Sequence, residues 1–278
     1  MPYFRSYLAL WGFKLVNVRH DSIIKIRGLR TQFGEQVIHD GLDLDVRQGE
    51  VLGVVGGSGT GKSVLLRTII GLNSPQGGTI DVLGTDVHQS SEAERQALRT
   101  RFGVLFQDGA LFSSLTVCEN IQVPMREHLR MGMELMDELA ALKIAMVGLP
   151  RNAGPKFPSE LSGGMRKRAG LARALSVDPE IIFLDEPTAG LDPIGAAAFD
   201  RLIRELQSSL GLTVFMVTHD LDSLTAICDR IAVLVEKKVR VATMAEHMED
   251  PHPWIQEYFK GPRARAAMNA GSGQAEMV

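Results

Sequence analysis

Residues 56–63 read Gly-Gly-Ser-Gly-Thr-Gly-Lys-Ser, and this octet decides the fold because of what flanks it. The apolar run of residues 51–55, Val-Leu-Gly-Val-Val, precedes it and predicts a buried parallel strand. Apolar residues at helical spacing follow it, at Val64, Leu65, Leu66, Ile69 and Ile70. The pattern G-x-x-x-x-G-K-[ST] on a strand-to-helix turn is a phosphate-binding P-loop, so we predict nucleotide binding.

The P-loop residues are suited to hold phosphates and a magnesium ion. Glycines let backbone N–H groups converge on the β-phosphate, and the helix N-terminus adds partial positive charge. Lys62 can reach the β- and γ-phosphates, and the Ser63 hydroxyl can bind Mg²⁺. The predicted nucleotide-binding residues of the turn are Gly56, Gly57, Ser58, Gly59, Thr60, Gly61, Lys62, Ser63 and Val64.

A second part of the site is predicted where the apolar strand of residues 181–184 ends in Asp185 and Glu186. At the carboxyl edge of a parallel sheet, Asp185 would face the P-loop and hold Mg²⁺, usually through water. Glu186 would then act on the water that attacks the γ-phosphate. The alternative is a pair of solvated acids at a strand end, and the upstream P-loop favours the catalytic interpretation.

A third part is the stretch Leu-Ser-Gly-Gly-Met at residues 161–165, which precedes a helix. Free N–H donors at that helix start would form a second anion site, comprising Ser162, Gly163, Gly164 and Met165. One nucleotide does not need two such cradles from one chain. We therefore predict a homodimer in which this turn of one subunit closes over ATP held by the other. Taken alone, the stretch would be an ordinary glycine-rich helix start.

Predicted strands alternate with helices along most of the chain, which indicates an α/β fold with a mostly parallel sheet and a helical insertion. In the insertion, Thr116-x-x-Glu119 predicts a capping box, and one apolar helix face is predicted at Leu135, Leu139, Leu142 and Met146. Short strands are predicted over residues 23–29 and 42–46, and a helix over residues 193–210. We expect three regions: an N-terminal extension at 1–22, a nucleotide-binding domain at 23–245 and a C-terminal extension at 246–278, disordered in its last part.

Composition excludes some classes of protein. The 278 residues are 45% hydrophobic and 23% charged, as in ordinary soluble globular proteins. A net charge of −3 gives no drive toward nucleic acid, and no nucleic-acid partner is expected. Cys118 and Cys228 are predicted to be free thiols.

No apolar run reaches the length of a membrane span, so a function at a membrane would require docking onto another protein. The aromatic first twenty residues favour an extension over an export signal.

The motifs, taken in order, resemble those of the ATP-binding cassette (ABC) ATPases over about residues 23–243. The resemblance implies a P-loop NTPase (RecA-like) fold with a helical subdomain at about 111–174 and a small antiparallel β region. It implies that Phe33 stacks on adenine, that Gln107 senses Mg²⁺ and the lytic water, and that Asp192 links the two sites of a dimer. His219 would hold the γ-phosphate and orient Glu186.

Residues 105–112, 124–128 and 161–174 are similar to the Mla/Mce-associated lipid-transport ATPases. This likeness implies an inner-membrane permease, an Mce-domain lipid-binding protein and a place on the cytoplasmic face of the inner membrane. A small regulatory subunit is left open. The stretch of residues 254–259 resembles the tail of some members, where a helix that caps its own domain and a subunit contact are equally open.

Three functions remain after this comparison. The first is an ATPase that drives lipid transport between the inner and outer membranes. The second is the ATPase of a polar-solute importer of the amino-acid type, which a soluble solute-binding partner would support. The third is a non-transport regulatory or nucleic-acid-linked ABC protein, which the acidic pI disfavours.

Overall fold

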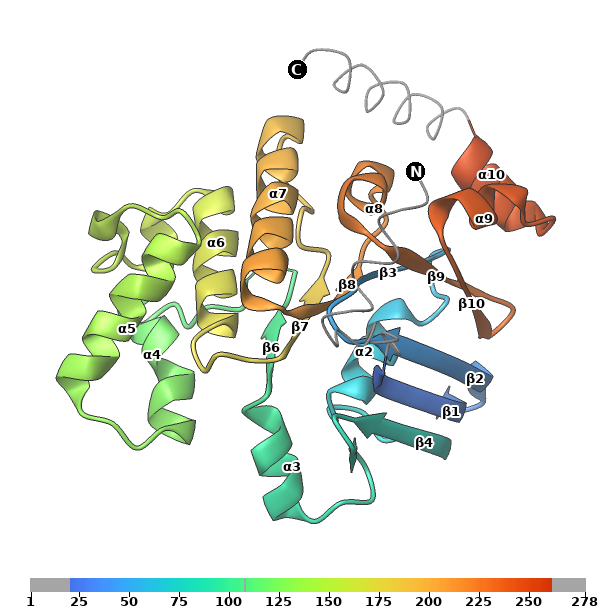
Figure 1. Ribbon diagram of the computed structural model, residues 1–278, viewed down its shortest axis with the longest axis horizontal. Helices are drawn as coiled ribbons and strands as arrows, with labels where there is room; N and C mark the ends of the chain where they lie inside the picture. The colour runs from blue at the N-terminus through green and yellow to red at the C-terminus, as the bar shows by residue number, and fades with distance from the viewer. Residues whose placement is uncertain (1–20, 108, 262–278) are drawn as a thin grey trace, which may run out of the picture.

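The structure is a computed structural model that describes residues 21–107 and 109–261 (Figure 1). Its larger sheet has the strand order β10-β9-β3-β8-β7-β6 and is parallel except for the antiparallel edge strand β10. These strands are β3 (Val51–Gly56), β6 (Phe102–Leu105), β7 (Ile181–Asp185), β8 (Thr213–Val217), β9 (Arg230–Val235) and β10 (Lys238–Ala242). Strands β7 and β8 are buried along their whole length, as expected for a parallel sheet covered on both faces. The predicted mostly parallel sheet is confirmed.

The smaller sheet is antiparallel, with the order β2-β1-β4-β5. It consists of β1 (Ser22–Phe33), β2 (Gln36–Arg47), β4 (Gly77–Val82) and β5 (Thr85–Asp86). The β1–β2 hairpin pairs as far as Phe33 opposite Gln36, so these strands are longer than the hydrophobic runs that predict them. A hydrophobic core joins this sheet to β3 and to α2 (Lys62–Ile69), which places the hairpin beside the P-loop.

Helices gather at the β6 edge of the larger sheet, where Figure 1 shows α4, α5 and α6 side by side. The predicted capping box at Thr116 is confirmed, because the Glu119 carboxylate accepts a hydrogen bond from the Thr116 N–H at 2.7 Å. The helices are α2, α3 (Glu92–Arg99), α4 (Val117–His128), α5 (Met133–Met146), α6 (Gly163–Ala174), α7 (Pro193–Leu210), α8 (Leu221–Ile227), α9 (Met244–Glu249) and α10 (Pro253–Lys260). The 3-10 turns Arg151–Ala153 and Pro158–Glu160 lie between α5 and α6.

The buried face of α5 includes only part of the predicted one. Leu139 and Met146 are partly buried and pack against the core, whereas Leu135 and Leu142 are 47% and 52% exposed. The buried residues of the helix include Met136, Ala140 and Ile144. Apolar residues lie on most sides of α5, so its sequence period does not choose a face, and packing against α4 and α6 makes the choice.

The end of the described chain packs onto the larger sheet. Helix α9 begins at Met244, so the predicted boundary between residues 245 and 246 falls within this helix. Ile255 and Phe259 of α10 are fully buried in a cluster with Val55. Most of the predicted N-terminal extension and the segment predicted to be disordered lie outside the described residues, and the division into domains stays a prediction.

Two further sequence predictions concern thiols and membrane spans. Cys118 and Cys228 are free thiols, as predicted. In the described part of the chain, no helix has the length and apolar character needed to span a bilayer.

Candidate active site

The P-loop connects β3 to α2 in a backbone conformation that requires glycine. Gly59 and Gly61 have φ angles of 76° and 95°, in the left-handed region. A Cβ atom on Gly61 would lie 2.3 Å from Ile38 Cγ2 and 2.7 Å from His39 Nε2. Strand β2 therefore presses directly against the turn, and no side chain at position 61 fits between them.

The same hairpin carries the predicted adenine platform. Phe33 ends β1 and its side chain is 53% exposed, which is unusual for a large apolar ring. Gly34 follows with a φ of 56° and turns the chain into β2. Because β2 touches the P-loop at Gly61, the exposed ring belongs to the hairpin that borders the phosphate site. Its stacking on adenine stays a prediction.

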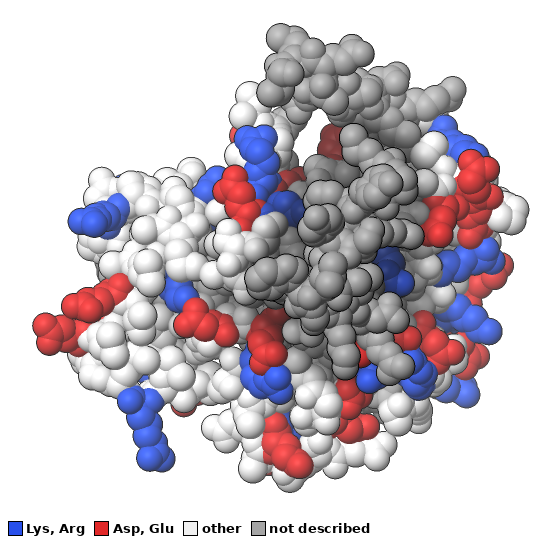
Figure 2. Space-filling model, in the orientation of Figure 1, with Lys and Arg blue, Asp and Glu red and all other residues white. Residues whose placement is uncertain are grey.

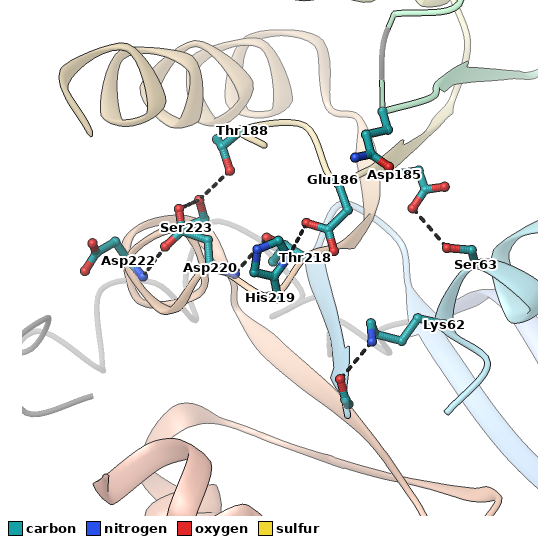
Figure 3. A network of polar contacts seen from close by, with 12 residues as sticks. Lys62, Ser63, Asp185, Glu186, Thr188, Thr218, His219, Asp220, Asp222 and Ser223 are labelled. Carbon is teal, nitrogen blue, oxygen red and sulfur yellow. Dashed lines mark hydrogen bonds and ion pairs between the residues drawn. The ribbon is translucent and has the colours of Figure 1, made fainter. Parts of the chain in front are cut away.

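The first residues of α2 meet the acidic end of β7. The Lys62 ammonium donates hydrogen bonds to the carbonyls of Gly56 at 2.8 Å and Gly57 at 3.0 Å. The Ser63 hydroxyl donates to Asp185 Oδ1 at 3.4 Å (Figure 3). Burial, followed by the charge of Glu186, raises the pKa of Asp185, and the bond from Ser63 opposes this shift. A desolvated carboxylate beside a second one is an environment that favours a bound cation.

These oxygen atoms fit the predicted magnesium site. A hydroxyl and a carboxylate are donors that Mg²⁺ accepts, together with water and phosphate oxygens. Gln107 follows β6 on the same sheet edge: Leu105 pairs with Leu184, so Gln107 and Glu186 stand at matching positions beyond neighbouring strands. The donor set is therefore consistent with the ligands predicted from the sequence, whose roles stay predictions.

Glu186, the predicted base, and His219, which is predicted to orient it, are in direct contact. His219 Nδ1 lies 2.8 Å from Glu186 Oε2 (Figure 3). Strands β7 and β8 pair in parallel, and the Glu186 N–H continues this pairing by donating to the Val217 carbonyl at 2.8 Å. Adjacent strands thus bring together two residues far apart in sequence. A carboxylate held by an imidazole at the edge of a phosphate site can position and deprotonate an attacking water.

Glu186 also has a strained backbone. Its φ is 52°, a region that costs a residue with a side chain roughly 1–2 kcal/mol. Bonds on both sides hold it there: its N–H bonds Val217, and its carbonyl accepts from the Lys167 ammonium at 3.0 Å. Strain of this kind clusters at functional sites, where it fixes a side chain that packing alone would not.

Lys167 is absent from the residues predicted for the site. This buried lysine of α6 also donates to the Gln107 carbonyl at 2.8 Å, so one ammonium holds both residues that follow β6 and β7. Its position in the helix between Arg166 and Arg168 gives no sign of this role. Only the packing of α6 against the sheet edge shows it.

Polar side chains also connect the loops after Glu186 and His219. The Ser223 hydroxyl donates to Asp200 at 2.8 Å. It also lies 3.4 Å from the Thr188 hydroxyl (Figure 3). Burial raises the pKa of Asp200 to about 6. A cleft of about 360 Å³ separates the two loops and is lined by Glu186, Thr188, Ala189, Gly190, His219, Asp220, Leu221 and Asp222. This network has no sequence motif, and the prediction does not include it.

The Leu-Ser-Gly-Gly-Met turn stands apart from the P-loop of its own chain. Ser162 caps α6 by accepting a hydrogen bond from the Met165 N–H at 3.3 Å. Figure 1 shows α6 grouped with α4 and α5, away from α2. Within the described residues, no hydrogen bond joins this turn to the P-loop. Asp192 caps α7 by accepting from the Gly195 N–H at 2.9 Å, and its predicted link between two sites stays a prediction.

A mostly parallel sheet with a P-loop after one strand and an acid pair after another defines a P-loop nucleotide hydrolase. Comparison with known protein families also shows which family within that class the chain belongs to. Residues 39–189 match the ABC transporter family, and the chain belongs to it as an ATP-binding cassette. It is an ATPase that binds ATP. A cassette dimer and a membrane permease are the partners expected of such a protein.

Several named proteins are similar to this chain. The "Probable ribonucleotide transport ATP-binding protein mkl" of Mycobacterium leprae is 40% identical over 86% of this chain and 69% of its own length. The "Intermembrane phospholipid transport system ATP-binding protein MlaF" of Haemophilus influenzae is 38% identical over 82% of this chain and 86% of its own length. The dimeric structure of the cassette MJ0796 bound to ADP and Pi matches with a TM-score of 0.72 and 29% identity, over 79% of this chain and 98% of that one.

Proposed function

We propose that this chain is the ATP-hydrolysing subunit of an ABC transporter that moves phospholipid between the inner and outer membranes. The Glu186–His219 contact at 2.8 Å beside the P-loop supports hydrolysis, because it provides a positioned base for the attacking water. The likeness to the MlaF protein, over most of both chains, supports the phospholipid substrate.

In this proposal two ATP molecules are held in a head-to-tail homodimer, each between the P-loop of one subunit and the Ser162–Met165 turn of the other. Phe33 stacks on adenine, Lys62 neutralises the β- and γ-phosphates, and residues 56–64 bind the phosphates through backbone N–H groups. Glu186 activates the water and His219 orients Glu186. When bound through Ser63, Gln107 and Asp185, Mg²⁺ stabilises the negative charge of the phosphates. Asp192 links the two sites.

The proposed partners are a permease of the inner membrane and an Mce-domain lipid-binding protein, and a small regulatory subunit stays an open question. The cassette would lie on the cytoplasmic face of the inner membrane and contact the membrane through the permease. On the face that Figure 2 shows, the region of α4, α5 and α6 displays more uncharged surface than the side of the antiparallel sheet. Phe112 and Phe157 of this region are 52% and 43% exposed, which supports it as the permease-docking side.

A second candidate function is transport of a ribonucleotide, because the mycobacterial mkl protein is 40% identical to this chain. The cassette chemistry would be unchanged, since the transported molecule need not touch the ATP site. The two candidates are therefore distinguished by the protein that accompanies the permease, which would bind lipid in one case and a solute in the other. The polar-solute importer is the broader form of this alternative.

The experiment is to purify the tagged chain with its native membrane partners in mild detergent and to identify the associated proteins and lipids. The complex is then placed in lipid nanodiscs, and ATP hydrolysis is measured with added phospholipid or ribonucleotides. A permease, an Mce-domain protein and bound phospholipid are expected. A permease with a soluble solute-binding protein, or hydrolysis stimulated by ribonucleotides alone, would contradict lipid transport. Recovery without any membrane protein would contradict the transporter itself.

A further inference from the structure

Helix α10, the last element of the described residues, lies beside two ATP-site motifs. The Tyr258 hydroxyl donates a hydrogen bond to the His219 backbone carbonyl at 3.1 Å. A Cβ atom placed on Gly57 of the P-loop would lie 3.5 Å from Trp254 Nε1, an ordinary van der Waals separation. One helix therefore bonds the backbone of the residue that contacts Glu186 and places the Trp254 ring beside the phosphate-binding turn.

Helix α10 is rigidly placed for these contacts. Ile255 and Phe259 are fully buried and pack with Val55, which immediately precedes the P-loop. On the neighbouring side of the helix, the rings of Trp254 and Tyr258 stack with centroids 4.8 Å apart. Phe259 meets the Tyr258 ring edge to face at 5.0 Å. The buried pair anchors the helix to β3, and the ring contacts restrict the direction of the Tyr258 hydroxyl.

The need for such support is visible at His219. Its imidazole is 72% exposed, so packing around the ring does little to fix its position. The ring can keep its contact with Glu186 only if the backbone of its loop is held. Burial raises the pKa of Tyr258, and the charges of Asp220 and Glu186 act in the same direction. The phenol therefore stays protonated and remains a hydrogen-bond donor to the carbonyl.

We propose that Tyr258 and Trp254 are positioning residues of the ATP site, through which α10 sets the placement of His219 relative to the P-loop. The inference rests on the role proposed above for His219. Tyr258 acts through the His219 backbone and Trp254 through Gly57, and neither residue needs to contact the nucleotide. Hydrolysis is then sensitive to the position of a helix outside the ATP motifs.

The first test is Tyr258→Phe, which removes the hydroxyl and keeps the ring contacts. We expect kcat for ATP to fall about two- to tenfold, the range of one hydrogen bond, with KM for ATP and the unfolding midpoint unchanged. Lys260→Gln is the matched control, because Lys260 lies exposed on the same helix, and it should hydrolyse ATP as the parent does. A structural defect would instead lower the unfolding midpoint.

His219→Ala separates failure of this inference from failure of the proposed function. We expect it to slow hydrolysis about a hundredfold. If it does so while Tyr258→Phe keeps the parent kcat, the inference is wrong and the proposed function stands. If His219→Ala itself hydrolyses ATP at the parent rate, the proposed role of His219 is wrong, and the inference fails with it.

The second test uses fluorescence, because the chain has two tryptophans, Trp11 and Trp254. In a Trp11→Phe chain, the emission of Trp254 should shift when ATP occupies the P-loop, and ADP should shift it too. The same chain with Lys62→Ala should require much more ATP for the shift. Emission that does not change at saturating ATP would overturn the contact proposed for Trp254.

Discussion

Two helix N-termini of this chain are candidate phosphate sites, and their surroundings differ. The P-loop before α2 lies among groups of its own chain that can do chemistry, namely Lys62, Asp185 and Glu186. At the turn before α6, Ser162 and Gly163 are exposed, and the basic side chain that reaches the turn, Arg166, bonds the Leu161 carbonyl. One chain thus holds a catalytic half and a half without catalytic groups, and a second copy placed head to tail would complete both.

The largest expected effect is the loss of hydrolysis in Glu186→Gln. The amide keeps the shape of the side chain but cannot accept the proton of the attacking water, so turnover should fall about 10²- to 10⁴-fold while ATP binding remains. Phosphate release and ATP binding are measured in parallel. The same variant should form a stable dimer only with ATP, which size-exclusion chromatography tests. Near-parent turnover would remove Glu186 from the role of base.

Mixing two inactive chains tests the two halves directly. Lys62→Ala damages the P-loop half and Ser162→Arg blocks the turn, so each chain alone should lose at least about tenfold of its hydrolysis. In an equal mixture, half of the dimers carry one intact composite site out of two. Hydrolysis should therefore recover to about a quarter of the parent value if the partner subunit completes the site. No recovery after subunit exchange would contradict the head-to-tail arrangement.

Alanine at one glycine of each half should change the free energy of unfolding by different amounts. Gly61→Ala places a Cβ in the left-handed region and against Ile38 and His39, so we expect a loss of roughly 2–4 kcal/mol in the free energy of unfolding. Gly163→Ala meets no atom within 4 Å, so its unfolding free energy should change by less than about 0.5 kcal/mol. Urea unfolding measures both. Equal losses would show that the turn before α6 is as constrained as the P-loop.

A pH dependence is expected from His39, which lies under the P-loop. Burial lowers the pKa of His39 to about 4 from 6.5, so the unfolded chain binds a proton that the folded chain does not between these values. Stability from this group is complete above pH 6.5 and is lost as the pH falls toward 4, by roughly 3 kcal/mol in all.

Asp200 opposes this trend, because its raised pKa of about 6 makes the folded chain the better proton binder between 3.8 and 6. The difference between the parent and His39→Leu therefore isolates the histidine. We expect this difference in unfolding free energy to grow from pH 4 to pH 6.5. A difference that is constant with pH would show that His39 titrates normally in the folded protein.

Local sequence was sufficient for the parts of the fold that depend on neighbours along the chain. The P-loop strand and helix, the capping box at Thr116 and the helix Pro193–Leu210 follow from short-range patterns and are found in the structure. The buried face of α5 does not follow, because Leu135 and Leu142 are as apolar as Met136 and Ile144. Only the neighbouring helices decide which of these side chains is buried.

The features of the site also fall into those that local sequence predicts and those that depend on tertiary packing. The sequence by itself determined the nucleotide chemistry, since Lys62, Ser63, Asp185 and Glu186 are residue types with fixed spacing to a strand or helix end. Tertiary structure alone decided which groups support them: Lys167 on the carbonyls of Gln107 and Glu186, and Tyr258 on that of His219. Backbone carbonyls are the same at every residue, so a bond to one leaves no pattern in the sequence, and only packing of distant segments creates it.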